Sequence, residues 1–421
     1  MNDRSSQIEL PPATSEILVE IAARFGTPSY AFDIRRIRQQ VDKLRLHLPD
    51  QVDLLYSFKA NASLGICDVL EDCGVGAEVA SAGELATAIE AGFSDQRIFV
   101  TGPFKSAETL SLLENLPAAV ISVDSPGELE ALSELAIPQA VVLRLRPDFG
   151  SCAVVEAGSE SRFGFTAADL GRAAELLDSS PIELLGFHIF SGSQMLDTSA
   201  LNDQLGRAME LALRSADRLG IQPSLINLGG GFGIPYGPTD EEIELAVLGE
   251  ALARQVELAS PARIVVELGR YLVAQSGWYL TSVLDQQTLQ GRRAVVVDGG
   301  THQRGDMCGL NLSTDAHPPH LLAAEQSPLE ATDVLGCLSL PSDILARAAM
   351  LPTTVAGQVL AFANAGAYGV WSSPAAFHGS PLPAEVAFDG TSIQLMRERK
   401  PAQGILDGQR HVVSSGLAAH S

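Results

Sequence analysis

The sequence predicts an α/β protein built from a (β/α)8 TIM barrel and a C-terminal antiparallel β domain. Between Val52 and Gly269, apolar β-branched runs alternate with stretches rich in Ala, Leu and Glu, which is typical of strands that alternate with helices. The runs are continuously apolar, as in parallel strands covered on both faces, and eight of them within about 220 residues indicate a closed barrel. Beyond Arg270 the helical stretches cease, which favours a separate antiparallel sheet.

An amphipathic helix at Ser15–Phe25 and a short strand at Thr27–Asp33 are expected to precede the barrel. The barrel strands are expected at Val52–Lys59, Val75–Ser81, Arg97–Gly102, Ala119–Asp124, Ala140–Arg146, Leu184–Phe190, Leu225–Gly229 and Ile264–Gly269. The helices between them are expected to include Gly83–Ala91, Ser106–Leu113, Pro126–Leu135, Ala167–Leu177, Thr198–Leu219 and Asp240–Glu257.

The C-terminal part is expected to consist almost entirely of strands. Strand-like runs lie at Tyr271–Leu284, Arg293–Asp298, Gln358–Asn364, Ala384–Phe388 and Ser392–Arg397, with a single helical turn at Leu329–Asp333. The expected division is an N-terminal helix and strand over residues 1–34, whose strand joins the C-terminal sheet, a barrel over 35–280 and a β domain over 281–421. Because no low-complexity linker separates these parts, we expect them to pack against each other.

The composition excludes several classes of partner. Of 421 residues, 46% are hydrophobic, and 51 acidic against 28 basic side chains give a net charge of −23. This charge repels nucleic acid and anionic membranes, so an anionic ligand has to be held by local donors. The five cysteines and eight histidines show no disulfide or metal spacing, and neither an apolar signal segment nor a membrane span is evident. We expect a soluble cytoplasmic protein without a metal.

Residues capable of chemistry gather at the expected ends of the strands. In a parallel barrel the loops after the strands meet at one mouth, where functional side chains lie. The residues at or near these ends are Lys59, Ser81, Asp124, Arg144, Phe190, Gly229–Gly231 and Glu267–Arg270. Lys59 is the most informative, because a lysine that closes a hydrophobic strand has to be exposed, paired or chemically modified.

Two of these loops suit a phosphorylated ligand. Gly229–Gly231 offers backbone N–H groups without side chains, as a phosphate requires, although glycines also serve ordinary turns. Gly269 and Arg270, after the eighth strand, would complete such a site. Glu267 either pairs with a protonated ring nitrogen of a bound cofactor or forms a surface ion pair with Arg270.

Ten ordered motifs extend this pattern from Pro28 to Arg397. They are YSFKAN around Lys59, EVASAGEL (Glu78–Leu85), GPFK (Gly102–Lys105), LRLRP (Leu143–Pro147), RFG (Arg162–Gly164), GFHIFSGSQ (Gly186–Gln194), NLGGGFG (Asn227–Gly233), ELGRYLVA (Glu267–Ala274), VDGG (Val297–Gly300) and NAGAYG (Asn364–Gly369). In these motifs the chain resembles the alanine-racemase-fold (fold-type III) pyridoxal-phosphate decarboxylases of diaminopimelate, ornithine and arginine. It is most similar to the branch with the butirosin-pathway glutamyl-acyl-carrier-protein decarboxylase and the exosortase-associated decarboxylases.

The resemblance implies a set of roles at the mouth. Lys59 would hold pyridoxal 5′-phosphate as a Schiff base, the internal aldimine, and Glu267 would pair with its pyridine nitrogen. The other cofactor-binding residues would be Arg144, Phe190, Ser193, Gly229, Gly230, Gly231, Gly269, Arg270 and Tyr368. Members of this family are obligate homodimers in which the C-terminal domain of one subunit closes the active site of the other, so Tyr368 would act in trans.

Phe190 departs from the pattern of this family. Ornithine and diaminopimelate enzymes stack a histidine on the cofactor ring, but this chain has Phe190 there and His188 two residues earlier. Positions two apart on a strand share a face but lie in different layers. Phe190 is therefore the expected stacking group, and His188 the expected barrel-interior residue bonded to a neighbour.

The segment Gly336–Asp343 also departs from the pattern. Counting from both of its ends places Ser339 in the position of the cysteine that reprotonates the substrate carbon, whereas a one-residue local shift would place Cys337 there. A hydroxyl is a poorer proton donor than a thiol. Leu340 stands where related enzymes carry a carboxylate for a distal ammonium, and Thr301–Asp306 lacks the Arg and Tyr of diaminopimelate-specific enzymes.

The first functional hypothesis is therefore decarboxylation, through an external aldimine and a quinonoid, of an L-amino acid or an amino-acid conjugate. The substrate would be free, amide-linked or presented on a carrier protein. The alternatives are a diaminopimelate- or ornithine-type decarboxylase of a free diamino acid, and an amino-acid racemase. A non-catalytic pyridoxal-phosphate-binding protein is a further alternative, since it would keep Lys59 but lose the proton donor.

Overall fold

A closed eight-stranded barrel forms the first half of the computed structural model, which describes residues 10–134, 140–150, 155–156, 161–305, 318–323 and 327–411. Neighbouring barrel strands are all parallel and follow the order β10-β11-β2-β3-β4-β5-β6-β8. They are β2 (Val52–Ser57), β3 (Gly76–Val79), β4 (Ile98–Val100), β5 (Val120–Val123), β6 (Ala140–Leu145), β8 (Glu183–Ile189), β10 (Leu225–Asn227) and β11 (Arg263–Leu268). The predicted barrel is confirmed, although each of its strands ends one or two residues earlier than expected.

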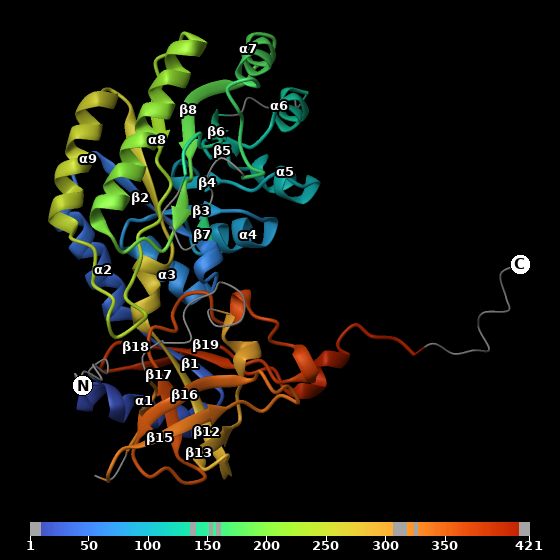
Figure 1. Cartoon of the computed structure of the whole chain (residues 1–421). Coiled ribbons are helices and arrows are strands. Elements are labelled where there is room, and N and C mark those ends of the chain that lie inside the picture. Colours follow the sequence, from blue (N-terminus) through green and yellow to red (C-terminus); the bar gives the residue numbers. More distant parts are fainter. Residues whose placement is uncertain are drawn as a thin grey trace, which may run out of the picture.

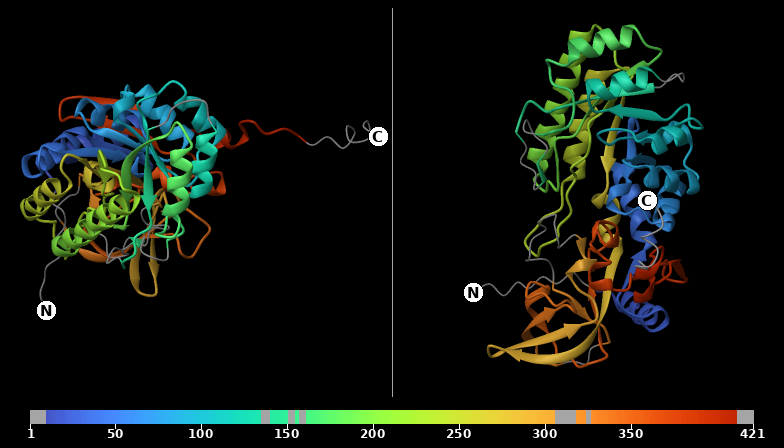
Figure 2. Two further views of the ribbon diagram at one scale, coloured as in Figure 1. Left: turned by 90° about the horizontal axis from the view of Figure 1, so that it is seen from above. Right: turned by 90° about the vertical axis from the view of Figure 1, so that its right-hand side faces the viewer.

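Helices cover the outside of the barrel (Figure 1; Figure 2, left). They are α2 (Ile34–His47), α3 (Leu64–Asp72), α4 (Ala82–Glu90), α5 (Ala107–Leu113), α6 (Pro126–Ser133), α7 (Leu170–Asp178), α8 (Thr198–Leu219) and α9 (Leu245–Ala259). The bounds of α8 match the prediction because both ends carry strong signals: the Asp197 side chain accepts from two backbone N–H groups, and Gly220 ends the helix at φ 67°. Helix α9 begins five residues later than expected, since the Asp240 carboxylate binds the backbone N–H groups of Tyr236 and Gly237 in a turn.

The second half of the chain forms a nine-stranded sheet below the barrel (Figure 1; Figure 2, right). Its strands are β1 (Ser29–Asp33), β12 (Gly277–Leu289), β13 (Arg292–Val297), β14 (His320–Leu321), β15 (Glu330–Leu335), β16 (Ile344–Leu351), β17 (Val359–Phe362), β18 (Ala384–Phe388) and β19 (Ile393–Arg397). The order is β16-β15-β13-β12-β1-β18-β19, and β17 pairs with β12 and β14. Among the strands that the structure describes in this sheet, the pairs β1–β18 and β13–β15 are parallel and the others antiparallel, so the sheet is mostly antiparallel, as predicted. A two-stranded sheet of β7 (Val155–Glu156) and β9 (Gly192–Ser193) lies apart from both.

The N-terminal segment belongs to this sheet. Strand β1 lies between β12 and β18, pairing antiparallel with the first and parallel with the second. Helix α1 (Pro12–Phe25) covers the sheet, because Leu18 and Ile21 pack in one apolar cluster with Trp278 and Val386. We propose domain boundaries at residues 34 and 280, which separate the N-terminal helix and strand, the barrel and the β domain.

Two expected elements of the C-terminal part are wrong. The run from Tyr271 is helical, with α10 (Arg270–Val273) and a 3-10 turn (Ala274–Ser276) before β12 begins at Gly277. Its four residues 271–274 are all buried, and a short, wholly buried apolar run does not separate strand from helix by periodicity. The turn expected at Leu329–Asp333 is instead the start of β15, whose partner β16 was missed because its sequence ILARAAML resembles a helix.

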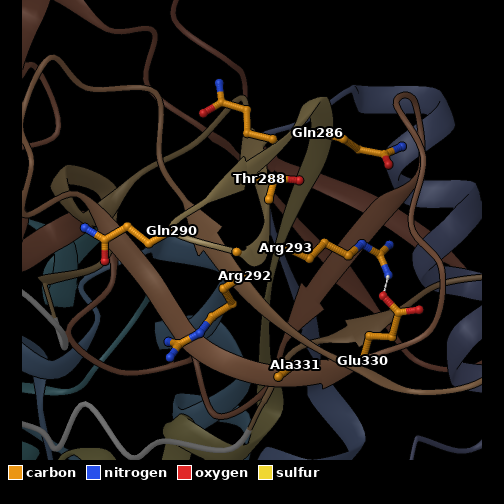
Figure 3. Close-up of a pocket in the computed structure, with 9 residues that line it drawn as sticks. Gln286, Thr288, Gln290, Arg292, Arg293, Glu330 and Ala331 are labelled. Atoms are coloured by element: carbon orange, nitrogen blue, oxygen red, sulfur yellow. Dashed lines mark hydrogen bonds and ion pairs between the residues drawn. The ribbon is translucent and has the colours of Figure 1, made fainter.

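The β12–β13 hairpin ends in a polar hollow on the side away from the barrel. Figure 3 shows its lining, in which Arg293 points toward Glu330 of β15 across a gap of 3.5 Å. The Glu330 side chain is 60% exposed, so this pair contributes at most about 1 kcal/mol. None of the helices in the described ranges is both long and apolar enough to span a membrane.

Candidate active site at the barrel mouth

Lys59 stands in a 3-10 turn (Phe58–Ala60) directly after β2. Phe58 and Ala60 on either side are buried in the apolar core, which turns the intervening lysine outward into the mouth, where its side chain is 46% exposed. Its Nζ lies 3.7 Å from Oε2 of the buried Glu78. The charge of Glu78 raises the pKa of Lys59 against the opposing effect of burial, with smaller contributions from Tyr368 and Glu267.

A cavity of about 230 Å³ opens beside Lys59. Its lining is Ser57, Lys59, Phe190, Ser193, Gly231, Phe232, Glu267, Leu268, Gly269, Arg270 and Tyr368. Most of the residues predicted at the strand ends therefore meet around one space. Gly229 and Gly230 lie behind it, where a side chain on Gly230 would come within 1.8 Å of the Glu267 carbonyl oxygen.

One side of the cavity is built to receive an anion. Arg270 is buried, its Nη2 donates to Ser193 Oγ at 3.2 Å, and its guanidinium stacks 4.8 Å from the centre of the Tyr368 ring. Nε and Nη1 of Arg270 have no hydrogen-bond partner among the described residues. Leaving two buried cationic donors unsatisfied is costly. Gly231, at φ 104°, borders the same space, and a Cβ there would lie 2.4 Å from Met195 Cε.

Glu267 occupies the opposite side, near the end of β11. Its Oε1 accepts a hydrogen bond from Asn227 Nδ2 at 2.7 Å and lies 3.3 Å from His188 Nε2. Burial alone would raise the pKa of Glu267, but His188, Lys59 and Asn227 outweigh it and hold this pKa below its usual range. The site therefore contains an ionised carboxylate that faces a cationic amine.

His188 lies inside the barrel, as the sequence predicts, and Phe190 lies at the cavity. Phe190 borders the cavity, with Lys59 Nζ 5.3 Å from the centre of its ring. His188 is buried inside the barrel, bonds through Nδ1 to Ser122 Oγ at 2.8 Å and packs edge-on against Phe99. A flat apolar ring, an amine, a carboxylate and an anion pocket thus surround one cavity.

The family of this chain follows from comparison with known proteins. Residues 34–274 match the pyridoxal binding domain of the pyridoxal-dependent decarboxylases. The chain belongs to this family. It is 30% identical to the L-glutamyl-[BtrI acyl-carrier protein] decarboxylase of Niallia circulans, over 95% of this chain and 97% of the relative, and 31% identical to the diaminopimelate decarboxylase of Methanothermobacter thermautotrophicus, over 93% of each.

Solved structures agree with this assignment. A diaminopimelate decarboxylase structure has a TM-score of 0.84 at 26% identity and covers 97% of both chains. The Helicobacter pylori diaminopimelate decarboxylase, complexed with L-lysine, has a TM-score of 0.83 at 25% identity and covers 93% of this chain and 98% of that one. The protein is therefore a pyridoxal-phosphate-dependent decarboxylase with a TIM barrel and a β domain.

The cavity of this decarboxylase fits its cofactor. The two unsatisfied donors of Arg270 and the side-chain-free approach at Gly231 suit a phosphate. The ionised Glu267 suits a protonated pyridine nitrogen, and the Lys59 amine suits an aldehyde. The residues present therefore fit pyridoxal phosphate.

Four predicted site residues do not line this decarboxylase's cavity: Gly229 and Gly230, which lie behind it, and Arg144 and Ser339. Arg144 is the last residue but one of β6, where it pairs with Asp124 at 3.2 Å and stacks on Phe163, and its charge opposes the rise in the Lys59 pKa. Ser339 lies in the β15–β16 loop, which Asp343 ties together by accepting from the Leu338 backbone N–H at 2.8 Å. Neither Ser339 nor Cys337 borders the cavity of its own chain. Of Thr301–Asp306, the last residue lies outside the described ranges.

Tyr368 lies in the active site of its own subunit, so the expectation that it acts in trans is wrong. After β17 the chain turns back over the barrel mouth, and the Tyr368 backbone N–H donates to the Ala60 carbonyl at 2.7 Å. Asn61 Nδ2 donates to the Gly366 carbonyl at 3.0 Å beside it. These bonds join the Tyr368 segment to the turn that carries Lys59.

Sequence reasoning missed Glu78 and Asn227. Glu78 precedes the end of β3 by one residue, and its Oε1 accepts a hydrogen bond from Thr101. Asn227 ends β10, where it donates to Glu267 and accepts from the Gly229 backbone N–H at 2.8 Å. Both stand at strand ends within the motifs EVASAGEL and NLGGGFG, so the rule that located Lys59 could have included them.

Proposed function

We propose that this decarboxylase acts on an L-amino acid whose far end carries no free ammonium. An amino acid joined by an amide or thioester bond to a carrier protein is the leading case. The observation that carries this proposal is Leu340, an apolar side chain where the resemblance implies a carboxylate for a distal ammonium. Burying an ammonium without a partner costs several kcal/mol, on the order of 10³-fold in kcat/KM.

The character of the Leu340 loop supports the proposal. The Leu340 side chain is 42% exposed, and between Gly336 and Ser342 the loop holds no charged residue. Leu338, Leu340 and Pro341 give it an apolar surface that a neutral chain can contact without a desolvation penalty. The Niallia circulans relative is named for a glutamyl group on an acyl-carrier protein, which is a substrate of this chemical kind.

We assign the cofactor contacts as follows. Pyridoxal phosphate, when bound, supplies the electron sink for the charge that loss of the carboxyl group leaves on the substrate's Cα. Lys59 Nζ would hold the cofactor covalently, and Glu267 would hold its ring nitrogen. Arg270, Ser193 and the Gly229–Gly231 loop would hold its phosphate, with Tyr368 of the same subunit packed against Arg270.

The residues around Lys59 control the charge of its amine and line the cavity beside it. Because Glu78 favours the cationic form of Lys59, the amine has to lose a proton before it can react, and Glu78 Oε2, 3.7 Å away, has no hydrogen-bond partner among the described residues. Glu78 is therefore the assigned ion-pair partner that sets the pH at which Lys59 loses that proton. Phe190 and Phe232 line the cavity and give it an apolar wall beside Lys59.

We further propose a homodimer in which Ser339 of one subunit reaches the cavity of the other and returns the proton to the substrate. This is supported by the resemblance and by the position of Ser339 away from the cavity of its own chain. Burial, followed by the charge of Asp343, raises the pKa of Cys337. The Cys337 thiol, two residues before Ser339 in the chain, therefore stays protonated near neutral pH. We place the enzyme in the cytoplasm, where the free thiols of Cys67, Cys73 and Cys337 would persist.

Decarboxylation of a free diamino acid is the second candidate, since several relatives of similar identity are diaminopimelate decarboxylases. A racemase of the same cofactor chemistry is the third. The test is carbon dioxide release from glutamate, glutamyl-pantetheine, a glutamyl-carrier protein, ornithine, lysine and diaminopimelate, with Lys59→Ala as the inactive control. We expect kcat/KM to be highest for a conjugate. Turnover of a free diamino acid above roughly 10⁴ M⁻¹s⁻¹, with slower conjugates, would overturn the proposal.

A further inference from the structure

The Glu267 carboxylate is contacted on one oxygen only. Asn227 Nδ2 donates to Oε1 at 2.7 Å, and His188 Nε2 lies 3.3 Å from the same atom. Within the described part of the chain, Oε2 takes part in no hydrogen bond, although Glu267 borders the cavity. The two contacts therefore divide the carboxylate into a held oxygen and an available one.

The surroundings of His188 determine which ring nitrogen carries the proton. Its Nδ1 lies 2.8 Å from Ser122 Oγ, and its Nε2 has no hydrogen bond of good geometry to any described group, Oε1 of Glu267 being the contact within ion-pair distance. A buried carboxylate accepts but cannot donate, so Nε2 has to carry the hydrogen and the Ser122 hydroxyl donates to Nδ1. The edge-on contact with Phe99, at 5.7 Å between ring centres, holds the ring plane.

The support for His188 continues through the interior of the barrel. The Ser122 carbonyl accepts a hydrogen bond from the buried Lys105, whose Nζ also bonds the Gly102 carbonyl at 3.0 Å and lies 3.1 Å from Glu128 Oε1. Ser122, Lys105 and Glu128 are buried, and the contacts among them restrict the movement of Ser122. His188 is therefore held from behind while Nε2 faces Glu267.

Asn227 connects Glu267 to the loop on the phosphate side. Its Oδ1 accepts from the Gly229 backbone N–H at 2.8 Å, while its Nδ2 donates to Glu267. The Glu267 backbone N–H in turn donates to the Gly229 carbonyl at 2.8 Å. One amide thus fixes the distance between the carboxylate and the glycine loop.

We propose that His188 and Asn227 are positioning residues that clamp Oε1 of Glu267, so that Oε2 alone is presented to the ring nitrogen of the cofactor. This inference rests on the cofactor contacts assigned under Proposed function. Two donors on Oε1 withdraw negative charge from the carboxylate and make it a weaker base, so a proton shared with the ring nitrogen stays on the nitrogen. The distance from His188 Nε2 to Glu267 Oε1 is 3.3 Å in the free protein. We expect this distance to shorten once the ring nitrogen of the cofactor is bound at Oε2.

The two residues of the clamp have different consequences. Of the residues assigned to the cofactor, His188 contacts Glu267 and none of those that hold the phosphate in the described part of the chain, so its loss affects the electronic state of the cofactor and leaves phosphate binding intact. Asn227 contacts the carboxylate and the glycine loop, so its loss affects both. The clamp thus predicts that loss of His188 lowers kcat alone, whereas loss of Asn227 lowers kcat and also weakens cofactor binding.

The experiment compares His188→Leu, His188→Gln, Asn227→Ala and the control His47→Leu, a histidine of α2 on the outside of the barrel. For His188→Leu we expect kcat to fall about 10- to 100-fold, the loss associated with one hydrogen bond to a charged group, with an unchanged Kd for pyridoxal phosphate. His188→Gln keeps an N–H donor at a similar reach and restores most of the activity. Asn227→Ala lowers kcat and also raises the Kd about 10-fold.

A measurement on the unaltered protein supports the clamp without any substrate. With ¹⁵N-labelled histidine, we expect a slowly exchanging Nε2–H resonance that moves downfield when pyridoxal phosphate is added, that is absent in His188→Leu and that persists in His47→Leu. Failure of every substrate in the panel would overturn the proposed function and leave this result standing. The clamp is refuted if the chemical shift of the Nε2–H resonance does not change when pyridoxal phosphate is added. It is also refuted if His188→Gln lowers kcat and thermal stability as much as His188→Leu does.

Discussion

Replacing Glu267 by Gln tests the assigned electronic role of the site most directly. The substitution keeps the shape of the side chain and an oxygen that can accept from Asn227, so the fold and the cavity are preserved. It removes the negative charge that is buried beside His188 and faces Lys59. A ring nitrogen opposite a neutral amide has no anion to hold its proton, and the electron sink weakens accordingly.

The size of the loss follows from the burial of Glu267. Removing one partner of a buried ion pair costs about 3–5 kcal/mol, which corresponds to roughly 10²- to 10⁴-fold in rate. Since Arg270 and the glycine loop are untouched, the Kd for pyridoxal phosphate should change far less than kcat. Single-turnover measurement of carbon dioxide release separates the chemical step from product release. A Glu267→Gln enzyme that keeps most of its kcat would show that Glu267 is a structural ion-pair residue.

Three further predictions concern Lys59, subunit sharing and pH. Borohydride treatment of the yellow holoenzyme should attach the cofactor to Lys59 alone, as peptide mass mapping checks, and label on another lysine would reject the assignment. A mixture of Lys59→Ala and Ser339→Ala subunits should recover about a quarter of the activity, because half the dimers are hybrid and each hybrid has one intact site. If activity does not recover although the subunits are shown to exchange, the active sites are not shared. Since Glu78 raises the pKa of Lys59, Glu78→Gln should lower it, and the pH profile of cofactor reloading by apoenzyme should move to lower pH. An unmoved profile would show that Glu78 does not control the Lys59 proton.

The barrel could be predicted because its signals are local. The barrel strands are mainly apolar runs of three to seven residues, and helix α8 is fixed at both ends by Asp197 and Gly220. The β domain was harder to predict, because its pairings join distant segments. Strand β16 is rich in alanine and becomes a strand only through its contact with β15, a tertiary effect that its own sequence does not encode.

The site was predictable as far as strand ends identify it. Lys59, Glu267 and Arg270 fall at ends that the alternation locates, and all three border the cavity. The links between side chains were not predictable, because Asn227 and Glu78 act through distances that only the closed barrel creates. The position of Tyr368 depends on how the chain returns from β17, which no local pattern specifies.

The two hydrogen bonds that join the Lys59 turn to the residues around Tyr368 make the barrel dependent on a segment that lies some 300 residues later in the chain. During synthesis the barrel is complete well before that segment leaves the ribosome. Until it arrives, the Ala60 carbonyl and the Asn61 amide lack these partners, so the turn that carries the reactive lysine is held on one side only. The turn that presents Lys59 to an aldehyde is therefore complete only after the residues around Tyr368 have been made and have docked on the barrel.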